Sequence, residues 1–301
     1  MKKVFKKNKV VAVIVTYNRK DLLKECIQSI LKQKKVKSDI LVIDNNSSDG
    51  TFEYINDFIK SNQIIYLNTG ENLGGAGGFN FGLRKACELG YKYLWIIDDD
   101  CIVHKDTLFN FFEADKNLNG NYGFLSSKVL WKDGNLCVMN KQKKTFGKWL
   151  KDFDTNYQKI AMASFVSMFI KSDIIKEFGL PIKDFFIWTD DWEFSRRISR
   201  KLDCYYISSS VVTHKCKENI GASIDVVDGD RLDRFKYLYR NDCVLYRGEG
   251  FKGKILFSLR ILFHKFRVYK SSKKDKKKRI DIINKAVKEG KKFYPKIEFI
   301  N

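Results

Sequence analysis

Four short apolar segments alternate with helix-like segments in the first hundred residues, and this alternation limits the folds open to the chain. The apolar segments, expected as strands, cover residues 10–15, 40–43, 64–67 and 94–97. Between them, apolar residues recur at the three- and four-residue spacing of amphipathic helices. A strand–helix alternation of this kind predicts an α/β fold with a Rossmann-like, mostly parallel sheet flanked by helices. Polar segments that follow the strands should then meet at one sheet edge, where open α/β folds bind ligands.

Three consecutive carboxylates, Asp98, Asp99 and Asp100, directly follow the fourth expected strand. A buried strand cannot carry unpaired anions into a core, so we expect them at its carboxyl end. Asp98 and Asp100 are two residues apart, so on an extended backbone they point the same way. Together they could bind one divalent cation, Mn²⁺ or Mg²⁺. A solvated acidic turn is the alternative interpretation.

Two other polar features follow expected strands. The glycine-rich segment 74–78 precedes a helix, and its backbone N–H groups could approach phosphates. It lacks the lysine of a P-loop and the GxGxxG register, so a tight turn without a ligand is the alternative. Asp44 ends the second strand, where it could accept a hydrogen bond from a base or ribose, or cap a helix.

A second acidic centre, Asp190 and Asp191, lies among aromatic residues. Paired carboxylates in such a setting repel each other and lose hydration, which raises at least one pKa toward that of a general base. Capping of the helix that follows is the alternative. His214 is the only histidine in its stretch and is either structural or a third metal ligand.

The chain is strongly basic, with 57 Lys and Arg against 36 Asp and Glu, a net charge of +21. The basic residues concentrate in 2–9 and 252–292. This charge requires an anionic partner, but zinc-finger spacing and RNA-recognition aromatic motifs are absent from the sequence, so nucleic acid is not expected. As a helix, the basic and apolar segment 252–269 would suit an anionic membrane surface, with the polybasic segment 273–279 as a second signal. An ordinary packed helix with a solvated basic tail is the alternative.

The cysteines and the lengths of the apolar segments indicate in which cell compartment the protein is expected. The seven cysteines are scattered without a CxxC motif, which favours reduced thiols. The apolar segment 10–15 is too short for a signal peptide, and no stretch approaches the roughly 20 apolar residues of a membrane span. We therefore expect a protein of the cytoplasm or of the cytoplasmic face of the cell membrane.

In combination and order, these motifs resemble the inverting glycosyltransferases of family 2, which have the GT-A fold, over roughly residues 9–245. Three segments resemble the family's successive nucleotide-sugar segments: VIVTYNR at 13–19, VIDNNSSDGT at 42–51 and NLGGAGGF at 72–79. The last of these, the Asp98 triplet, the DDWEF segment at 190–194 and Tyr239-Arg240-Asn241 resemble galactofuranosyltransferases and bacterial rhamnosyltransferases.

The resemblance implies a role for each matching residue. Asp98, Asp100 and His214 would bind Mn²⁺ or Mg²⁺, and Asp191 would be the catalytic base, with Asp190 as the second candidate. Residues implied in binding the nucleotide sugar are Thr16, Asn18, Arg19, Asp44, Asn72, Gly74, Gly75, Asp98 and Asp99. Residues implied in binding the acceptor are Trp188, Trp192 and Glu193.

The resemblance also implies the reaction and the domain plan. The donor would be UDP-galactofuranose or dTDP-rhamnose, and the acceptor a hydroxyl of a glycan or polyprenyl-linked glycan in cell-surface polysaccharide synthesis. Residues 1–245 would form the GT-A domain, with 1–100 as its nucleotide-binding half and 101–245 as its acceptor-binding half. Residues 246–301 would form a basic amphipathic helical extension for membrane association. Another Mg²⁺-dependent nucleotide-using transferase, such as a nucleotidyltransferase, or a polyanion-binding protein are the alternatives.

Overall fold

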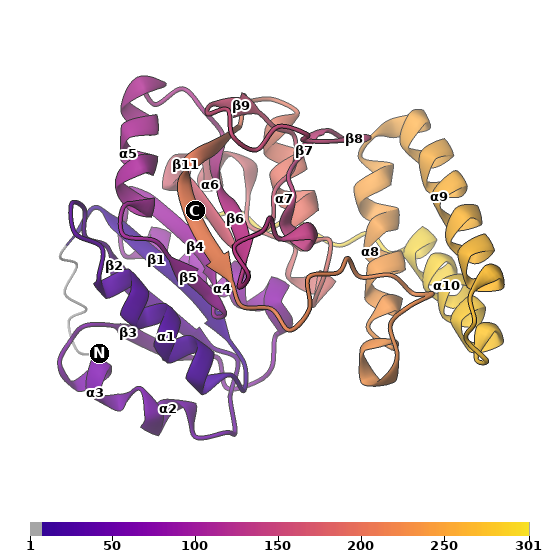
Figure 1. The fold of residues 1–301 in the computed structure, drawn as a ribbon, viewed down its shortest axis with the longest axis horizontal. Helices are drawn as coiled ribbons and strands as arrows, with labels where there is room; N and C mark the ends of the chain where they lie inside the picture. Colours follow the sequence, from indigo (N-terminus) through magenta and orange to yellow (C-terminus); the bar gives the residue numbers. More distant parts are fainter. Residues whose placement is uncertain (1–7, 301) are drawn as a thin grey trace.

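A computed structural model describes residues 8–300, so most of the predicted basic segment 2–9 lies outside the described residues. The protein is built on one large sheet flanked by helices, with a group of three helices at one side (Figure 1). The strand order is β3-β2-β1-β4-β10-β6-β11-β5, and a short β9 (Gln158–Lys159) pairs with β11. This architecture is the predicted mostly parallel α/β sheet.

The amino-terminal half of the sheet contains four parallel strands, as the alternation of the sequence predicts. They are β1 (Val10–Thr16), β2 (Asp39–Asp44), β3 (Ile65–Asn68) and β4 (Tyr93–Asp98). Alternate residues of β1 face opposite sides, with Ala12 in one buried apolar cluster and Val13 in the other. The sheet is therefore buried on both faces, as parallel sheets require.

The helices of this half differ from expectation in two places. They are α1 (Lys20–Leu31), α2 (Thr51–Tyr54), α3 (Asn56–Lys60) and α4 (Gly74–Glu88). The single helix expected after Gly50 is divided into α2 and α3. The glycine-rich segment, expected as a loop, is the first part of α4 because its glycines permit close packing. A Cβ at Gly78 would lie 2.5 Å from Val15 Cγ1, and one at Gly82 would lie 2.7 Å from Val13 Cγ1.

The second half of the sheet is mixed. Its longer elements are β5 (Cys101–Val103), α5 (Thr107–Asn117), β6 (Phe124–Trp131), β10 (Ser167–Lys171), α6 (Ser172–Phe178), α7 (Asp190–Ser199) and β11 (Tyr205–His214). Shorter elements are η1 (Val138–Asn140), β7 (Lys143–Thr145), β8 (Lys148–Trp149), η2 (Lys183–Phe185) and η3 (Gly229–Arg231). Strand β10 is antiparallel to β4 and β6, whereas β11 is parallel to β6 and antiparallel to β5. The β5–β11 pairing aligns His214 with Cys101, one residue after the acidic triplet.

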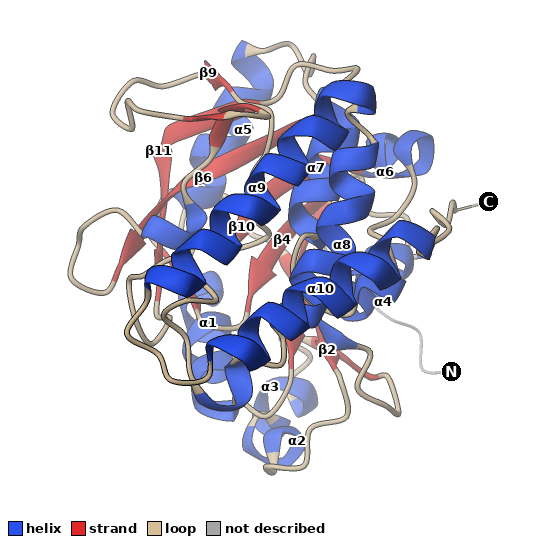
Figure 2. Cartoon of the chain, turned by 90° about the vertical axis from the view of Figure 1, so that its right-hand side faces the viewer, coloured by secondary structure: helices blue, strands red, loops and turns tan. Residues whose placement is uncertain are grey.

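Three helices, α8 (Phe235–Arg247), α9 (Gly250–Lys270) and α10 (Lys276–Lys292), form a unit beside the sheet, with α9 and α10 toward the viewer in Figure 2. They share an apolar core that includes Tyr239, Ile261 and Ile283. The boundary predicted at residue 245 therefore falls inside α8, within this packed unit.

The end of the chain returns to the sheet domain. Leu180 N donates to the Glu298 carbonyl oxygen at 2.8 Å, and the Glu298 carboxylate pairs with Arg84 and Lys183 at 3.0 and 2.6 Å. The segment predicted as a membrane-association tail is thus fastened to the sheet domain at its end. Among residues 8–300, no helix is long and apolar enough to cross a membrane.

Candidate active site

Polar residues from three parallel strands meet at one edge of the sheet. The register pairs Thr16 with Asp44 and Val15 with Asp98, so the ends of β1, β2 and β4 coincide. The amide of Asn45 donates to the Gly74 carbonyl oxygen at 2.9 Å, which brings the start of α4 to the same edge. The predicted convergence of Asp44, the glycine-rich segment and the acidic triplet is confirmed.

Asp98, Asp100 and His214 form a possible metal centre at this edge. One ligand atom from each lies within 4.8 Å of the others, and His214 Nε2 is 2.9 Å from Asp100 Oδ1. Carboxylate oxygens with one imidazole suit a small divalent cation such as Mn²⁺. The tertiary structure thus brings together the three residues that the resemblance implied.

Positive charge only partly balances these acids. Arg19 Nη1 lies 3.1 Å from both Asp99 Oδ1 and Asp100 Oδ2, and Thr16 Oγ1 donates to Asp99 Oδ2 at 2.8 Å. Burial, and then the charge of Asp100, raise the pKa of Asp98 to about 7. A divalent cation would neutralise this excess negative charge, so the residues present fit the metal.

His214 is held in place from both sides of its ring. Burial disfavours the imidazolium, but hydrogen bonding to Asp100 and to two nearby thiols outweighs it and raises the pKa of His214. On the other side, Asn140 Oδ1 lies 2.8 Å from His214 Nδ1. The ring is therefore fixed with Nε2 toward the carboxylates.

Asp190 and Asp191 begin helix α7, after a loop that accepts a hydrogen bond from the start of α4, Ala76 N to the Phe186 carbonyl oxygen at 3.1 Å. Burial raises the pKa of Asp190. Burial raises the pKa of Asp191 well above its ordinary value, and the charges of Asp190 and Asp98 add to the effect. The charge of Asp98 therefore acts on Asp191 although the two residues lie far apart in the sequence. Two separated parts of the sequence thus form one acidic site.

The loop before α7 has an unusual backbone. Phe186, Trp188 and Thr189 have φ values of 64°, 67° and 68°, a region that non-glycine residues rarely adopt. Such strain concentrates at functional sites and persists only where surrounding contacts impose it. Here it turns the chain sharply into the acidic pair.

Residues of α8 impose this loop conformation. Asn241 Nδ2 lies within hydrogen-bonding distance of the carbonyl oxygens of Phe185, Ile187 and Trp188, at 3.0, 3.2 and 2.9 Å. Thr189 Oγ1 donates to Asp242 Oδ1 at 2.9 Å, and Arg260 pairs with the other Asp242 oxygen at 3.2 Å. Asn241 was part of a recognised motif, but no pattern in the sequence revealed this role.

The residues predicted to bind the acceptor differ in placement. Trp192 stands edge-on to Trp149 at 5.7 Å, with the Lys143 ammonium 5.0 Å from its ring. Trp188 packs instead against Phe235, 5.1 Å between ring centroids. Glu193 is buried in an ion pair with Arg197 at 3.1 Å, which argues against the acceptor-binding role predicted for it.

Several residues predicted to bind the nucleotide sugar also hold the local backbone. Asp44 accepts hydrogen bonds from Ser47 N at 2.8 Å and from the Tyr66 hydroxyl at 2.6 Å. Both of its oxygens are therefore engaged, and one partner is the half-buried Tyr66, which no motif in the sequence indicated.

Two asparagines act similarly. Asn18 Oδ1 accepts from Ser48 N at 2.8 Å, and Asn72 Oδ1 accepts from Gly74 N at 2.9 Å. Gly74 packs against the strained loop, because a Cβ there would lie 2.1 Å from the Phe186 carbonyl oxygen. Gly75, in contrast, has open space around its Cβ position. The glycine-rich segment therefore connects the end of β2, at Asn45, to the strained loop that precedes Asp190 and Asp191.

The model of the family described as glycosyl transferase family 2 matches residues 11–178, more than half of the chain. The chain belongs to glycosyltransferase family 2. This is the family that the resemblance implied.

Two relatives show how far sequence similarity to this chain extends. Galactofuranosyltransferase GlfT1 of Mycolicibacterium smegmatis is 34% identical over 91 residues, 30% of this chain and 30% of that protein. Poly-beta-1,6-N-acetyl-D-glucosamine synthase of Staphylococcus aureus is 30% identical over 105 residues, 35% of this chain and 25% of that protein. The matches thus span under a third of each of these curated relatives.

Solved structures share the fold of this chain at low identity. S. aureus TarS 1–349 aligns over 93% of this chain and 71% of its own, with a TM-score of 0.57 and 12% identity. Mannosyltransferase PcManGT from Pyrobaculum calidifontis, in complex with GDP-Man and Mn²⁺, aligns over 92% and 73%, with a TM-score of 0.55 and 14% identity. These similarities confirm the predicted GT-A fold.

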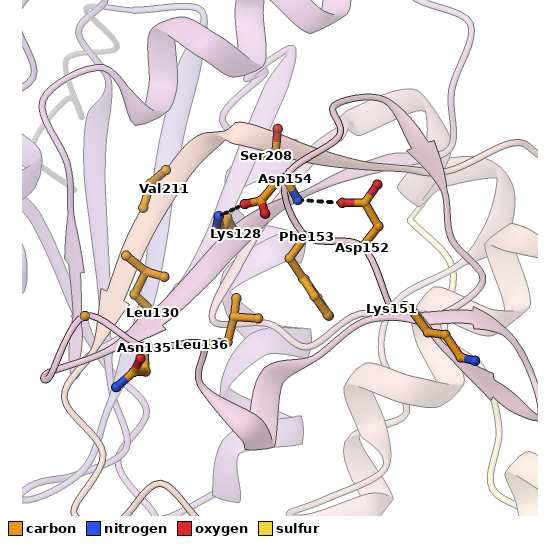
Figure 3. A pocket seen from close by; sticks show the side chains of 11 residues that line it. Lys128, Leu130, Asn135, Leu136, Lys151, Asp152, Phe153, Asp154, Ser208 and Val211 are labelled. Carbon is orange, nitrogen blue, oxygen red and sulfur yellow. Dashed lines mark hydrogen bonds and ion pairs between the residues drawn. The ribbon is translucent and has the colours of Figure 1, made fainter.

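A pocket of this family 2 member lies beside β6 and β11 (Figure 3). Lys128 pairs there with Asp154 at 2.8 Å, and Asp152 Oδ1 accepts from the Asp154 backbone at 2.9 Å. Its lining contains none of the residues predicted for the active site. We therefore assign the reaction to the acidic edge of the sheet.

Proposed function

We propose that this enzyme is an inverting, metal-dependent glycosyltransferase whose donor is UDP-galactofuranose or dTDP-rhamnose. The observation that carries the proposal is geometric: Asp98, Asp100 and His214 meet at one sheet edge, and the start of α4 joins that edge to the loop before Asp190 and Asp191 through the hydrogen bonds of Asn45 to Gly74 and of Ala76 to Phe186. One group would hold a diphosphate through a cation, and the other would accept a proton. Among the two donors, the relative named a galactofuranosyltransferase favours UDP-galactofuranose.

In the proposed mechanism, the acceptor hydroxyl attacks the anomeric carbon from the side opposite the diphosphate. Asp191 takes the hydroxyl proton as the new C–O bond forms and the bond from sugar to diphosphate breaks. Its raised pKa suits a general base, and in-line displacement inverts the anomeric configuration. A bound Mn²⁺ or Mg²⁺ would neutralise the charge that develops on the departing diphosphate. Arg19 and Thr16 would orient Asp99 beside the nucleotide.

The proposed acceptor is a sugar hydroxyl of a glycan or polyprenyl-linked glycan. Trp192 and Trp149 offer aromatic surfaces beside the acidic pair, with Lys143 between them and 4.9 Å from the Trp149 ring. Burial, followed by the charge of Arg260, lowers the pKa of Lys143 to about 8. An apolar wall with a cation suits a sugar that carries an anionic or lipid-linked group.

Helix α9 supports a proposed site at the cytoplasmic face of the membrane. A row of large apolar side chains on this helix is exposed, including Phe251 at 76%, Leu262 at 63% and Tyr269 at 73%. The rest of the row is Ile255, Leu256, Leu259, Phe263 and Phe266. Exposed Lys252, Lys254 and Lys270 flank this face. Apolar residues bordered by lysines complement an anionic lipid surface, where a lipid-linked acceptor would be found.

Calorimetric titration tests the proposed donor and metal. UDP or dTDP should bind in the presence of Mn²⁺ and lose most of its affinity without it, while GDP should bind poorly. Asp98→Asn and Asp100→Asn should each remove the metal dependence, and NMR of the product should show an inverted anomeric centre. Binding that is independent of both metal and carboxylates, or a retained anomeric configuration, would contradict the proposal.

A further inference from the structure

Two thiols lie behind His214, on the side of the ring away from Asp100. Cys137 Sγ is 3.7 Å from His214 Nδ1 and 4.0 Å from Cys216 Sγ. One ligand atom from each of the three residues lies within 4.8 Å of the others. All seven cysteines, which lie within the described residues, are free thiols. The imidazole thus stands between two donor sets, carboxylates at Nε2 and thiols at Nδ1.

Two of these separations are close to those of a tetrahedral zinc site. Zn–S bonds of about 2.3 Å and Zn–N bonds of about 2.0–2.1 Å place tetrahedral ligand atoms roughly 3.5–3.8 Å apart. The separations observed here, 3.7 and 4.0 Å, are close to this range before any ion draws the ligands together. Thiolates select Zn²⁺ over the hard cations Mn²⁺ and Mg²⁺. The donor set therefore differs in chemistry from the Asp98 and Asp100 centre.

A fourth possible metal ligand, the Asn140 amide oxygen, lies beside the two thiols and the imidazole. Asn140 Oδ1 is 2.8 Å from His214 Nδ1 and 3.0 Å from Cys137 Sγ, so it lies between the atoms that would bind an ion. The amide oxygen can become the fourth ligand or give way to water. On the opposite side of the ring, Asp100 contacts Nε2, the arrangement in which a carboxylate orients a zinc-bound histidine.

The loops that carry the two cysteines are fixed to each other. The Trp131 indole donates to the Cys216 carbonyl oxygen at 2.9 Å. Asn219 accepts from Val138 N at 2.7 Å and donates to the Leu136 carbonyl oxygen at 3.1 Å. Cys137 is buried, whereas Cys216 is partly exposed and gives an ion access from solvent. The ligand positions are thus held by contacts that do not depend on a metal.

We propose that Cys137, His214 and Cys216 form a Zn²⁺ site. When Zn²⁺ occupies it, His214 can no longer bind the cation held by Asp98 and Asp100. A neutral imidazole has one unprotonated nitrogen. When Nδ1 binds Zn²⁺, the remaining proton of the ring resides on Nε2. Nε2 then donates a hydrogen bond to Asp100 and cannot bind the Mn²⁺ of the Asp98 and Asp100 centre. The two thiols and the imidazole Nδ1 release their protons to solvent on binding, and Mn²⁺ keeps only Asp98 and Asp100. Zn²⁺ thereby inhibits transfer, a consequence that rests on the proposed function.

Spectroscopy of the Co²⁺-loaded full chain, with thiols kept reduced, tests the site without any activity measurement. The wild-type chain should show thiolate-to-cobalt charge-transfer absorption that one equivalent of Zn²⁺ abolishes. Cys137→Ser and Cys216→Ser should each remove this absorption. Cys87→Ser, in a buried free cysteine on α4, is the matched control and should retain it. Asp98→Asn should also retain it, because Asp98 belongs only to the other centre.

Electron paramagnetic resonance of free Mn²⁺ in the presence of UDP tests the exclusion, that is, the claim that bound Zn²⁺ prevents His214 from binding Mn²⁺. One equivalent of Zn²⁺ should weaken Mn²⁺ binding at least tenfold in the wild-type chain and leave Cys137→Ser unchanged. A wild-type chain without thiolate absorption overturns the Zn²⁺ site itself. Thiolate absorption together with unchanged Mn²⁺ affinity overturns the exclusion. If Mn²⁺ fails to bind even without Zn²⁺, the exclusion and the proposed function fail together, while the cobalt result still decides the site.

Discussion

The side-chain amide of Asn241 lies 2.9 Å from the carbonyl oxygen of Trp188, two residues before the acidic pair. Asn241 belongs to α8 and is fully buried, whereas Trp188 lies in the strained loop with a φ of 67°. This contact makes the position of the acidic pair depend on the helical unit. The unit is therefore part of the construction of the active site.

Replacing Asn241 should reduce catalysis more than donor binding. Asn241→Ala leaves three carbonyl oxygens without their donor, costs about 1–3 kcal/mol of unfolding free energy, and lets the loop relax. We expect kcat to fall at least tenfold while UDP affinity, measured by calorimetry, stays within about threefold.

A second buried amide provides the control. Asn80 Nδ2 donates to the Pro181 carbonyl oxygen at 2.8 Å, so Asn80→Ala should cost similar stability. It should leave kcat nearly unchanged, because this contact lies outside the strained loop. Equal losses of kcat in both variants would show that Asn241 acts only through general stability.

Asp191→Asn should abolish transfer and stabilise the unliganded enzyme. The folded state holds the proton of Asp191 to higher pH than the unfolded chain does, because the pKa is raised by burial, Asp190 and Asp98. The unfolding free energy therefore falls as pH rises through this window, at about 1.4 kcal/mol per unit of pKa shift. The amide removes this penalty, so the gain in Tm should be larger at pH 8 than at pH 5.

Asp173→Asn, at an exposed acid in α6, should change Tm little at either pH. Donor binding by Asp191→Asn should persist because Asp98 and Asp100 are intact. An Asp191→Asn variant that transfers sugar at the wild-type rate would rule out the proposed base.

Gly74→Ala should destabilise the enzyme far more than Gly75→Ala. Gly74 has a φ of +70°, and an added Cβ would lie 2.1 Å from the Phe186 carbonyl oxygen, which cannot move without displacing the strained loop. We expect a loss of about 2–4 kcal/mol in chemical denaturation. The neighbouring Gly75 meets no atom within 4 Å, so Gly75→Ala should cost less than about 1 kcal/mol.

Vesicle co-sedimentation should reveal the role of α9. The wild-type chain should sediment with vesicles that contain phosphatidylglycerol and much less with pure phosphatidylcholine, and salt should weaken binding. Leu259→Asp combined with Leu262→Asp should cut binding at least tenfold, because both side chains are exposed on the same helix. Phe299→Asp, an exposed aromatic outside α9, is the control. Equal binding by the double variant and the wild type would rule out α9 as the membrane-contacting surface.

The sequence predicted correctly those features that depend on local pattern and on strand direction. The apolar segments became β1 to β4, and the acids that follow β4 lie at the carboxyl edge, because buried strands exclude unpaired charges. The glycine-rich segment was expected as a loop, yet it is the start of α4. Its glycines reflect packing against Val15 and Phe186, which a single segment of sequence does not contain.

Glu193 shows a similar limit. The resemblance placed it with the aromatic residues that would bind the acceptor, but in the packed structure Glu193 is buried in an ion pair with Arg197. A matching motif identifies a residue, whereas the direction of its side chain depends on the packed orientation of the helix.

The sequence by itself determined the family, the parallel half of the sheet and the identity of the acids, because short-range periodicity and motifs encode them. Only the tertiary structure decided what meets those acids. The antiparallel pairing of β11 with β5 brings His214 beside Cys101 and hence to Asp100, more than a hundred residues away in the chain. The same pairing places His214 between carboxylates and thiols, and α8 fixes the loop before Asp190. Such contacts arise from long-range packing, which no local pattern specifies.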